Sequence, residues 1–143
     1  MAKTTFKSTY RFKIDRKGRV SIPADFRTVL AAKGEEELNV LPWAGPVARV
    51  IGDDVLARIG ANADPLAAFS AKPLDEAAMR AADLIALSLD AEGRVMLPER
   101  LIAHCKLSEI VAFAGRNTFF EIWNPEALDE FQAQWHATQG VQR

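Results

Sequence analysis

The chain has few of the side chains from which enzyme and metal sites are built. Its 143 residues include one cysteine, Cys105, and two histidines, His104 and His136. This set cannot complete the usual four-ligand zinc site, and no glycine-rich phosphate-binding loop is present. His104 and Cys105 are adjacent, and adjacent helical residues point about 100° apart, so a nucleophile–base pair is not expected. We therefore predict no enzyme activity, no cofactor and no small-molecule substrate.

Long apolar runs are also missing. No run approaches the ~20 residues that span a bilayer, and the basic start MAKTTFKSTYRFKID has no apolar signal-peptide core. A single cysteine, which cannot form an internal disulfide, suits a reducing compartment. The 49% hydrophobic content is typical of a folded globular protein. We expect a cytoplasmic protein without a membrane partner.

The charges are unevenly distributed. Residues 1–30 contain eight Lys and Arg against two Asp, a net charge of +6, so the rest of the chain carries −7 of the overall −1. Such separation is typical of a nucleic-acid-binding arm on an acidic body. It is also compatible with a solvated N-terminus, and charge alone leaves both interpretations open.

A ten-residue pattern occurs twice, 75 residues apart: IDRKGRVSIP at residues 14–23 and LDAEGRVMLP at residues 89–98. Each copy is followed by a helical pattern in which the shared proline suits the first turn. Gly34 is placed to end the first of these helices in a left-handed conformation. Cys105 takes the place of Leu30 in the second, which indicates a small buried apolar side chain.

Each half is predicted to run strand, turn, strand, helix, strand, helix. The later strands are expected in LNVLPW and in AFAGRNTFFEIW, and the last helix of each half begins with Asp53 or Asn124 as N-cap. In the C-terminal helix Leu128, Phe131 and Trp135 form one apolar stripe.

The segment between the halves contains a predicted loop at Gly60–Pro65 and an alanine-rich helix at Leu74–Ala86. We expect residues 1–60 to form a first repeat with the basic hairpin and residues 61–86 a helical connector. Residues 87–143 are expected to form a second repeat with a C-terminal helix. No long flexible linker separates the copies, so they are predicted to pack as one pseudo-symmetric unit.

The Asp-x-x-Gly part of each copy is turn chemistry. An Asp at the start of a turn accepts backbone hydrogen bonds, and the Gly supplies a positive φ. These positions are Asp15 and Gly18 in the first copy and Asp90 and Gly93 in the second. The following Arg is not required by the turn and could bind the Asp carboxylate or a phosphate. Both roles stay open for Arg19, whereas the structural role is favoured for Arg94.

The tips of the two hairpins differ. The first carries Arg16-Lys17 and the second Ala91-Glu92, although both need the same backbone. A basic tip neutralises phosphates, and Glu92 is repelled by them. We therefore predict that the first hairpin meets a polyanion and that the second is architectural. The candidate DNA-binding residues are Arg11, Lys13, Arg16, Lys17 and Arg19.

The two Asp-x-x-Gly-Arg hairpins, each followed by an apolar residue, Pro and a short helix, resemble the MraZ family of bacterial transcriptional regulators. The single unit is similar to AbrB-type and MazE-type swapped-hairpin domains. The resemblance implies a mainly β fold with short helices, a double-split β-barrel in which two tandem repeats interlock. The family's Asp-x-x-x-Arg motif falls on Asp15 and Arg19, and again on Asp90 and Arg94.

For function, the resemblance implies a sequence-specific regulator that binds double-stranded DNA at short direct repeats. These repeats are expected upstream of the division and cell-wall gene cluster, including the regulator's own gene. The resemblance also implies nucleoid association and a ring-shaped homo-oligomer, expected as an octamer or larger. An antitoxin-like or scaffold module that binds protein without specific DNA recognition is the alternative. The sequence leaves open the operator sequence, the subunit count and whether the protein represses or activates transcription. It also leaves open whether the second hairpin contacts DNA and whether the basic N-terminus is ordered.

Overall fold

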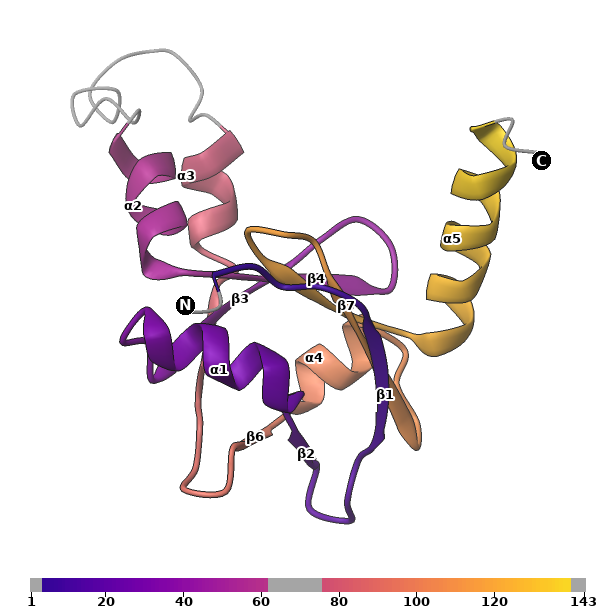
Figure 1. The fold of residues 1–143 in the computed structure, drawn as a ribbon, viewed down its shortest axis with the longest axis horizontal. Helices are drawn as coiled ribbons and strands as arrows, with labels where there is room; N and C mark the ends of the chain where they lie inside the picture. The colour runs from indigo at the N-terminus through magenta and orange to yellow at the C-terminus, as the bar shows by residue number, and fades with distance from the viewer. Residues whose placement is uncertain (1–3, 62–75, 140–143) are drawn as a thin grey trace.

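The structure is a computed structural model that describes residues 4–61 and 76–139. The strands form the framework and the helices are short (Figure 1). The elements of the first half are β1 (Thr9–Lys13), β2 (Arg19–Ser21), α1 (Ala24–Ala32), β3 (Glu37–Pro42), β4 (Val47–Ile51) and α2 (Asp53–Ala61). Those that follow are α3 (Glu76–Ala81), β5 (Ile85–Ser88), β6 (Arg94–Met96), α4 (Glu99–His104), β7 (Ile110–Gly115), β8 (Phe120–Trp123) and α5 (Pro125–Thr138).

The strand order shows that the two halves interlock. A six-stranded antiparallel sheet has the order β1-β7-β8-β4-β3-β5, and β2 pairs with β6 in a separate two-stranded ribbon. Exchanging each strand for its counterpart in the other half reverses the sheet order and reproduces the same sheet. A pseudo-twofold axis therefore passes between β4 and β8 and between β2 and β6. The predicted interlocked, mainly β fold is confirmed, although the described strands leave β1 and β5 as edges and form no closed barrel.

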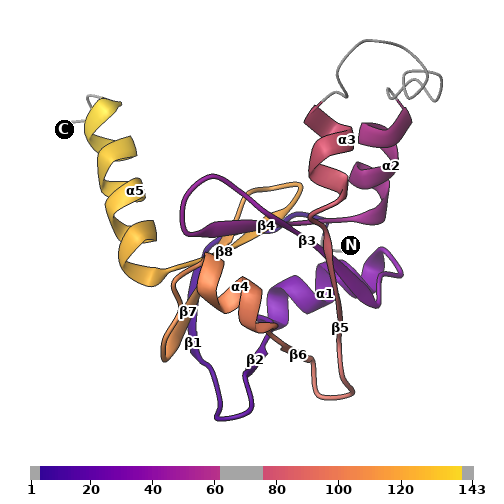
Figure 2. The ribbon, with the colours of Figure 1, turned by 180° about the vertical axis from the view of Figure 1, so that it is seen from behind.

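One hydrophobic core is shared by both halves. Phe26 of α1 contacts Phe120 of β8 with ring centres 4.7 Å apart, and Phe6 lies 5.1 Å from the same Phe120 ring. Val20 and Val95 extend into this core from the β2–β6 ribbon. Helices α1 and α4 lie between the six-stranded sheet and the ribbon (Figures 1 and 2). The inner face of the ribbon thus packs on the core, and its outer face lies at the surface.

The predicted helix at Leu74–Ala86 is wrong at its C-terminal end. Helix α3 ends at Ala81, and Ile85 begins β5, which pairs with β3. Burial of Ile85 and Leu87 in the core explains why this stretch is extended despite its alanine content. Leu74 lies outside the described residues, as does the predicted loop after Ala61; Gly60 and Ala61 belong to α2.

The prediction of one later strand in each half is also wrong, because each half has two. LNVLPW turns back through Gly45, with φ of +91°, into β4, and AFAGRNTFFEIW divides into β7 and β8 around Asn117, with φ of +70°. Two of the three predicted helix ends are confirmed. Gly34 has φ of +73°, and Asn124 caps α5 by accepting a hydrogen bond from the Ala127 N–H. Asp53 is the first residue of α2 rather than its N-cap.

Candidate nucleic-acid interface

The first hairpin is closed by its own aspartate. Asp15 Oδ1 accepts hydrogen bonds from the N–H groups of Lys17 (2.9 Å) and Arg19 (2.8 Å). Arg19 Nε donates to Asp15 Oδ2 at 2.8 Å, and Gly18 supplies φ of +84°. These hydrogen bonds, led by that from the Arg19 N–H, hold the pKa of the Asp15 carboxyl below its ordinary value. The turn therefore holds the Nε atom of Arg19 in place.

The second hairpin repeats this geometry. Asp90 Oδ1 accepts from the N–H groups of Glu92 (2.8 Å) and Arg94 (2.9 Å), and Arg94 Nε donates to Asp90 Oδ2 at 3.1 Å. Gly93 has φ of +78°. The pKa of Asp90 is lowered for the same reason, chiefly the hydrogen bond from the Arg94 N–H. The motif arginine consequently has a structural contact in both copies.

The two motif arginines differ in what surrounds the rest of the guanidinium. Arg94 Nη2 lies 3.4 Å from Glu92 Oε2, so Arg94 is paired with two carboxylates. Lys17 takes the place of Glu92 in the first copy, and Arg19 has no second carboxylate partner among residues 4–61 and 76–139. The turn that precedes Arg19 carries two exposed cations, Arg16 and Lys17, and one carboxylate, Asp15. The first hairpin therefore carries a local excess of positive charge.

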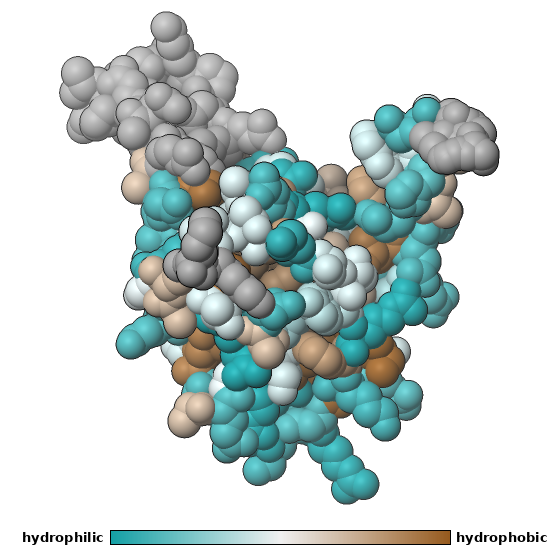
Figure 3. All heavy atoms as spheres, in the orientation of Figure 1, coloured by the Kyte–Doolittle hydropathy of each residue, from teal (hydrophilic) through white to brown (hydrophobic). Residues whose placement is uncertain are grey.

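The β2–β6 ribbon carries both arginines on one face. Arg19 is paired in register with Met96, and Arg94 with Ser21, while Val20 and Val95 between them point into the core. Met96 is 56% exposed although it is a large apolar side chain. The outer face of the ribbon and the two turns thus form one end of the molecule, which is largely hydrophilic (Figure 3). A two-stranded ribbon has dimensions that fit the major groove of B-DNA.

The candidate residues on β1 divide into two groups. Lys13 is exposed at the end of β1, beside the turn, and makes no ion pair with any residue that the structure describes. Arg11 instead forms an ion pair with Asp129 of α5. The structure therefore brings Lys13, Arg16, Lys17 and Arg19 to the hairpin, whereas Arg11 is held by the C-terminal helix.

Arg27 has a contact that the sequence interpretation missed. A Cβ atom at Gly93 would lie 2.4 Å from Arg27 Cδ, so the arginine of α1 covers the second hairpin at this glycine. Arg27 Nε donates to the Ile22 carbonyl oxygen at 3.1 Å. The 75-residue offset places apolar Ile102 at the position equivalent to Arg27, a difference between the copies that was available in the sequence.

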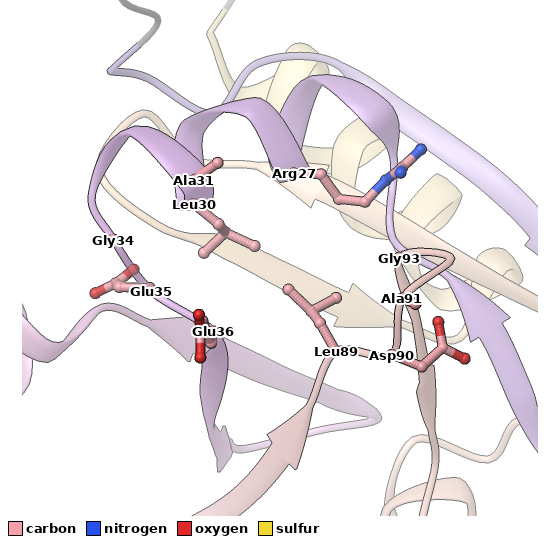
Figure 4. Close-up of a pocket in the computed structure, with 10 residues that line it drawn as sticks. All are labelled: Arg27, Leu30, Ala31, Gly34, Glu35, Glu36, Leu89, Asp90, Ala91 and Gly93. Carbon is pink, nitrogen blue, oxygen red and sulfur yellow. The ribbon is translucent and has the colours of Figure 1, made fainter.

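An open groove of about 520 Å³ lies beside Arg27, between the end of α1 and the second hairpin (Figure 4). Glu35, Glu36 and Asp90 are among the residues that line it. Three carboxylates against one arginine make this groove unfavourable for a phosphate backbone. The second hairpin is therefore flanked by negative charge, in contrast to the first.

The pair His104 and Cys105 does not form a nucleophilic site. Cys105 is buried, its Sγ contacts the Ile122 carbonyl oxygen, and burial raises its pKa to about 12. His104 Nε2 lies 2.8 Å from the Trp43 carbonyl oxygen and 3.0 Å from that of Val47, at the turn between β3 and β4. The contacts of both residues therefore stabilise the fold. Among residues 4–61 and 76–139, every helix is too short or too polar to span a bilayer.

Comparison with known proteins identifies the family. Residues 79–142 match the family described as "MraZ protein, putative antitoxin-like". The chain is 40% identical over 137 residues to the transcriptional regulator MraZ of Xanthobacter autotrophicus, covering 95% of this chain and 86% of that protein. It is 37% identical over 135 residues to the regulator of the same name in Gluconacetobacter diazotrophicus, covering 92% and 85%. For that of Pelagibacter ubique the identity is 34% over 128 residues, covering 89% and 83%. The chain therefore belongs to the MraZ family of transcriptional regulators.

Proposed function

We propose that the protein binds promoter DNA sequence-specifically through its first hairpin. The proposed targets are short direct repeats upstream of the division and cell-wall gene cluster, including the regulator's own gene. The protein acts there in the cytoplasm, at the nucleoid, as a ring-shaped homo-oligomer. The observation that carries the proposal is the difference between two otherwise equal turns. Arg94 is paired with two carboxylates, Asp90 and Glu92, whereas Arg19 is paired with Asp15 alone and its turn carries exposed Arg16 and Lys17.

The cations of the hairpin divide the work of binding. Lys13, Arg16 and Lys17 are exposed and have the reach of phosphate contacts, which hold the protein on the duplex without reading sequence. Arg19 stands on the outer face of the ribbon with its Nε fixed by Asp15. Its two Nη groups are left to donate to a base edge, for which the O6 and N7 atoms of guanine are the usual acceptors. Asp15 therefore acts as a positioning residue for Arg19.

One hairpin is too small to select a promoter alone. A few cationic side chains give mostly sequence-independent attraction. A ring presents the same hairpin on neighbouring subunits, so after one subunit has bound a repeat the next contact is intramolecular. Such avidity raises the affinity by a factor of roughly 10²–10⁴ when the spacing of the repeats allows both contacts. This requirement links homo-oligomerisation to the direct repeats.

The proposal is tested by footprinting the purified protein on DNA upstream of its own gene, followed by affinity measurements on one, two and three of the protected repeats. Affinity is expected to rise steeply with repeat number. It should fall when about five base pairs, half a turn of B-DNA, are inserted between repeats, since the hairpins then meet opposite sides of the duplex. Equal affinity for one and three repeats contradicts the avidity mechanism. Absence of any protection, together with a stoichiometric co-purifying protein, supports the antitoxin-like alternative instead.

A further inference from the structure

Four side chains lie on the outer face of the β2–β6 ribbon, two from each repeat. They are Arg19 and Ser21 of β2 and Arg94 and Met96 of β6. Because the strands are antiparallel, Arg19 stands opposite Met96, and Ser21 stands opposite Arg94. The outer face therefore has two ends. One end carries an arginine and a methionine, and the other carries an arginine and a serine.

Arg19 and Met96 are close neighbours across the ribbon. Next to this pair, the backbone N–H of Leu97 donates to the Gly18 carbonyl oxygen at 2.8 Å. Hydrogen-bonded and non-hydrogen-bonded pairs alternate along an antiparallel ladder, so Arg19 and Met96 form a non-hydrogen-bonded pair. The Cα atoms of such a pair are only about 4.5 Å apart, and their side chains lie closest. The two side chains therefore face the same small area outside the ribbon.

Met96 is exposed at a position where the fold needs no apolar side chain. It is 56% exposed and belongs to neither hydrophobic cluster in the described part of the chain. Its counterpart in the first repeat, 75 residues earlier, is Ser21 on the same face of the ribbon. The same backbone thus accepts a small polar residue. Packing within the subunit consequently does not explain the methionine.

The surroundings of Met96 indicate a DNA base as its partner. Its neighbour Arg19 is the side chain for which a base contact is proposed, and the turn holds the Nε atom of that arginine. In the major groove, the apolar group that a base pair presents is the C5-methyl of thymine. The other exposed large hydrophobic side chains in the described part of the chain lie on helices: Met79, Phe131 and Trp135.

We infer that Met96 is a specificity-determining residue that contacts the C5-methyl group of a thymine beside the base pair read by Arg19. The inference rests on the proposed function and adds to it a residue from the second repeat. Base pairs follow each other about every 3.4 Å along the duplex, a spacing comparable with that of the two side chains. Arg19 donates to guanine, whereas the flexible thioether of Met96 excludes water from the methyl group.

The opposite end of the ribbon face differs in both respects. Ser21 offers no large apolar surface, and Arg94 is paired with Asp90 and Glu92. Base recognition is therefore confined to the end that carries Arg19 and Met96. A face that reads bases at one end only distinguishes the two orientations of a DNA repeat.

The test removes the methyl group from the DNA. Deoxyuridine differs from thymidine by the C5-methyl alone, so each thymine is replaced in turn, at the same position of every protected repeat. Fluorescence anisotropy measures the affinity at constant salt. At one thymine beside a guanine, the wild type should lose roughly fourfold in affinity for each repeat bound, the effect of one buried methyl group. Met96→Ser, which copies the first repeat, should bind the two DNAs equally.

Two matched variants separate recognition from structure. Met96→Leu keeps an apolar side chain of similar volume and should still discriminate thymine from deoxyuridine. Ser21→Ala changes the equivalent position at the other end of the face and should respond to the methyl group like the wild type. All three variants should melt within a few degrees of the wild type, because both positions are exposed. Undiminished discrimination by a folded Met96→Ser variant overturns the inference.

The two proposals fail in different ways. Met96→Ser should weaken binding to the repeats without changing the salt slope, because a methionine neutralises no phosphate. Specific binding that requires Arg19 but responds neither to Met96→Ser nor to any deoxyuridine removes the methyl contact and leaves the proposed function intact. Absence of any sequence-specific binding by the wild type overturns both proposals.

Discussion

The two hairpins have the same backbone and different electrostatics. In each, an aspartate accepts two backbone N–H groups and the Nε of the arginine four residues later, and a glycine takes a positive φ. One hairpin then carries Arg16 and Lys17, and the other Ala91 and Glu92. Since the shared residues build the turn, their recurrence alone says nothing about DNA. We expect the functional information to lie at the two tip positions, where one copy carries two cations and the other a carboxylate.

The largest expected effect separates the two arginines. Arg19→Ala should weaken binding to the promoter repeats by about 1–3 kcal/mol per hairpin, roughly 5- to 150-fold, because a base contact is lost. Arg94→Ala should change this affinity less than about threefold. Both variants lose the ion pair with the turn aspartate, and Arg94→Ala also loses the contact with Glu92. Both should therefore show small decreases in Tm, and the decrease of Arg94→Ala should be at least as large as that of Arg19→Ala. Fluorescence anisotropy and thermal melting measure these quantities. An equal loss of affinity in two folded variants would place both hairpins on the DNA.

The basic tip has the next largest effect. Replacing Arg16-Lys17 by Ala-Glu removes two cations, so the slope of log affinity against log salt should flatten by about 1.8. The turn should survive, because Ala91-Glu92 occupies the same conformation in the second copy. Glu92→Ala is the matched control and should leave the slope unchanged. A salt slope that does not respond to the Arg16-Lys17 replacement would show that this tip does not reach the phosphates.

A single substitution should move the second hairpin toward the first. Glu92→Lys removes the second carboxylate from Arg94 and puts a cation where Lys17 stands in the first copy. If the second tip lies near the duplex, the salt slope should steepen by about 0.9. Measured by the same titration on promoter and random DNA, the gain should be similar for both, since a phosphate contact reads no sequence. A gain confined to the promoter would contradict the architectural role of this hairpin.

The smallest effect concerns pH. Hydrogen bonds lower the pKa values of Asp15 and Asp90 from 3.8. The donors are the backbone N–H and the side chain of Arg19 or Arg94, together with the backbone N–H of Lys17 or Glu92. A carboxyl whose folded pKa is depressed stabilises the fold above the unfolded pKa and loses that contribution as pH falls through the folded value. Asp15→Asn and Asp90→Asn should therefore each reduce the fall in Tm between pH 5 and pH 2. Thermal melting over this range checks it. A difference between the two variants would mean that the turns are not equivalent in stability.

The hairpins could be predicted from sequence because their chemistry is local. Asp15, Gly18 and Arg19 lie within one turn, and the pattern of Asp, Gly and Pro states its geometry directly. The same holds for the cap at Asn124 and the left-handed Gly34. The tip difference was likewise visible as charge, without knowledge of the fold.

The rest depends on contacts between distant parts of the chain. The pairing of β4 with β8 joins the two halves, and no local pattern in the sequence of β4 predicts which strand it pairs with. The DNA contact of Arg11 stays a prediction from its charge, and nothing in the sequence indicates its ion pair with Asp129, 118 residues away. The helix predicted through Ala86 was extended over β5 because alanine favours helices, and pairing with β3 prevailed. The exposure of Trp135 follows from the direction in which α5 leaves the sheet.

The most direct test of the account is the promoter affinity of a chain whose two tips are exchanged. This variant combines Arg16→Ala, Lys17→Glu, Ala91→Arg and Glu92→Lys, so composition and net charge equal those of the wild type. If the first hairpin carries recognition, specific affinity for the upstream repeats should fall at least tenfold in a folded, normally assembled protein. Wild-type affinity of the exchanged chain would contradict the account, because the position of the basic tip would then be irrelevant.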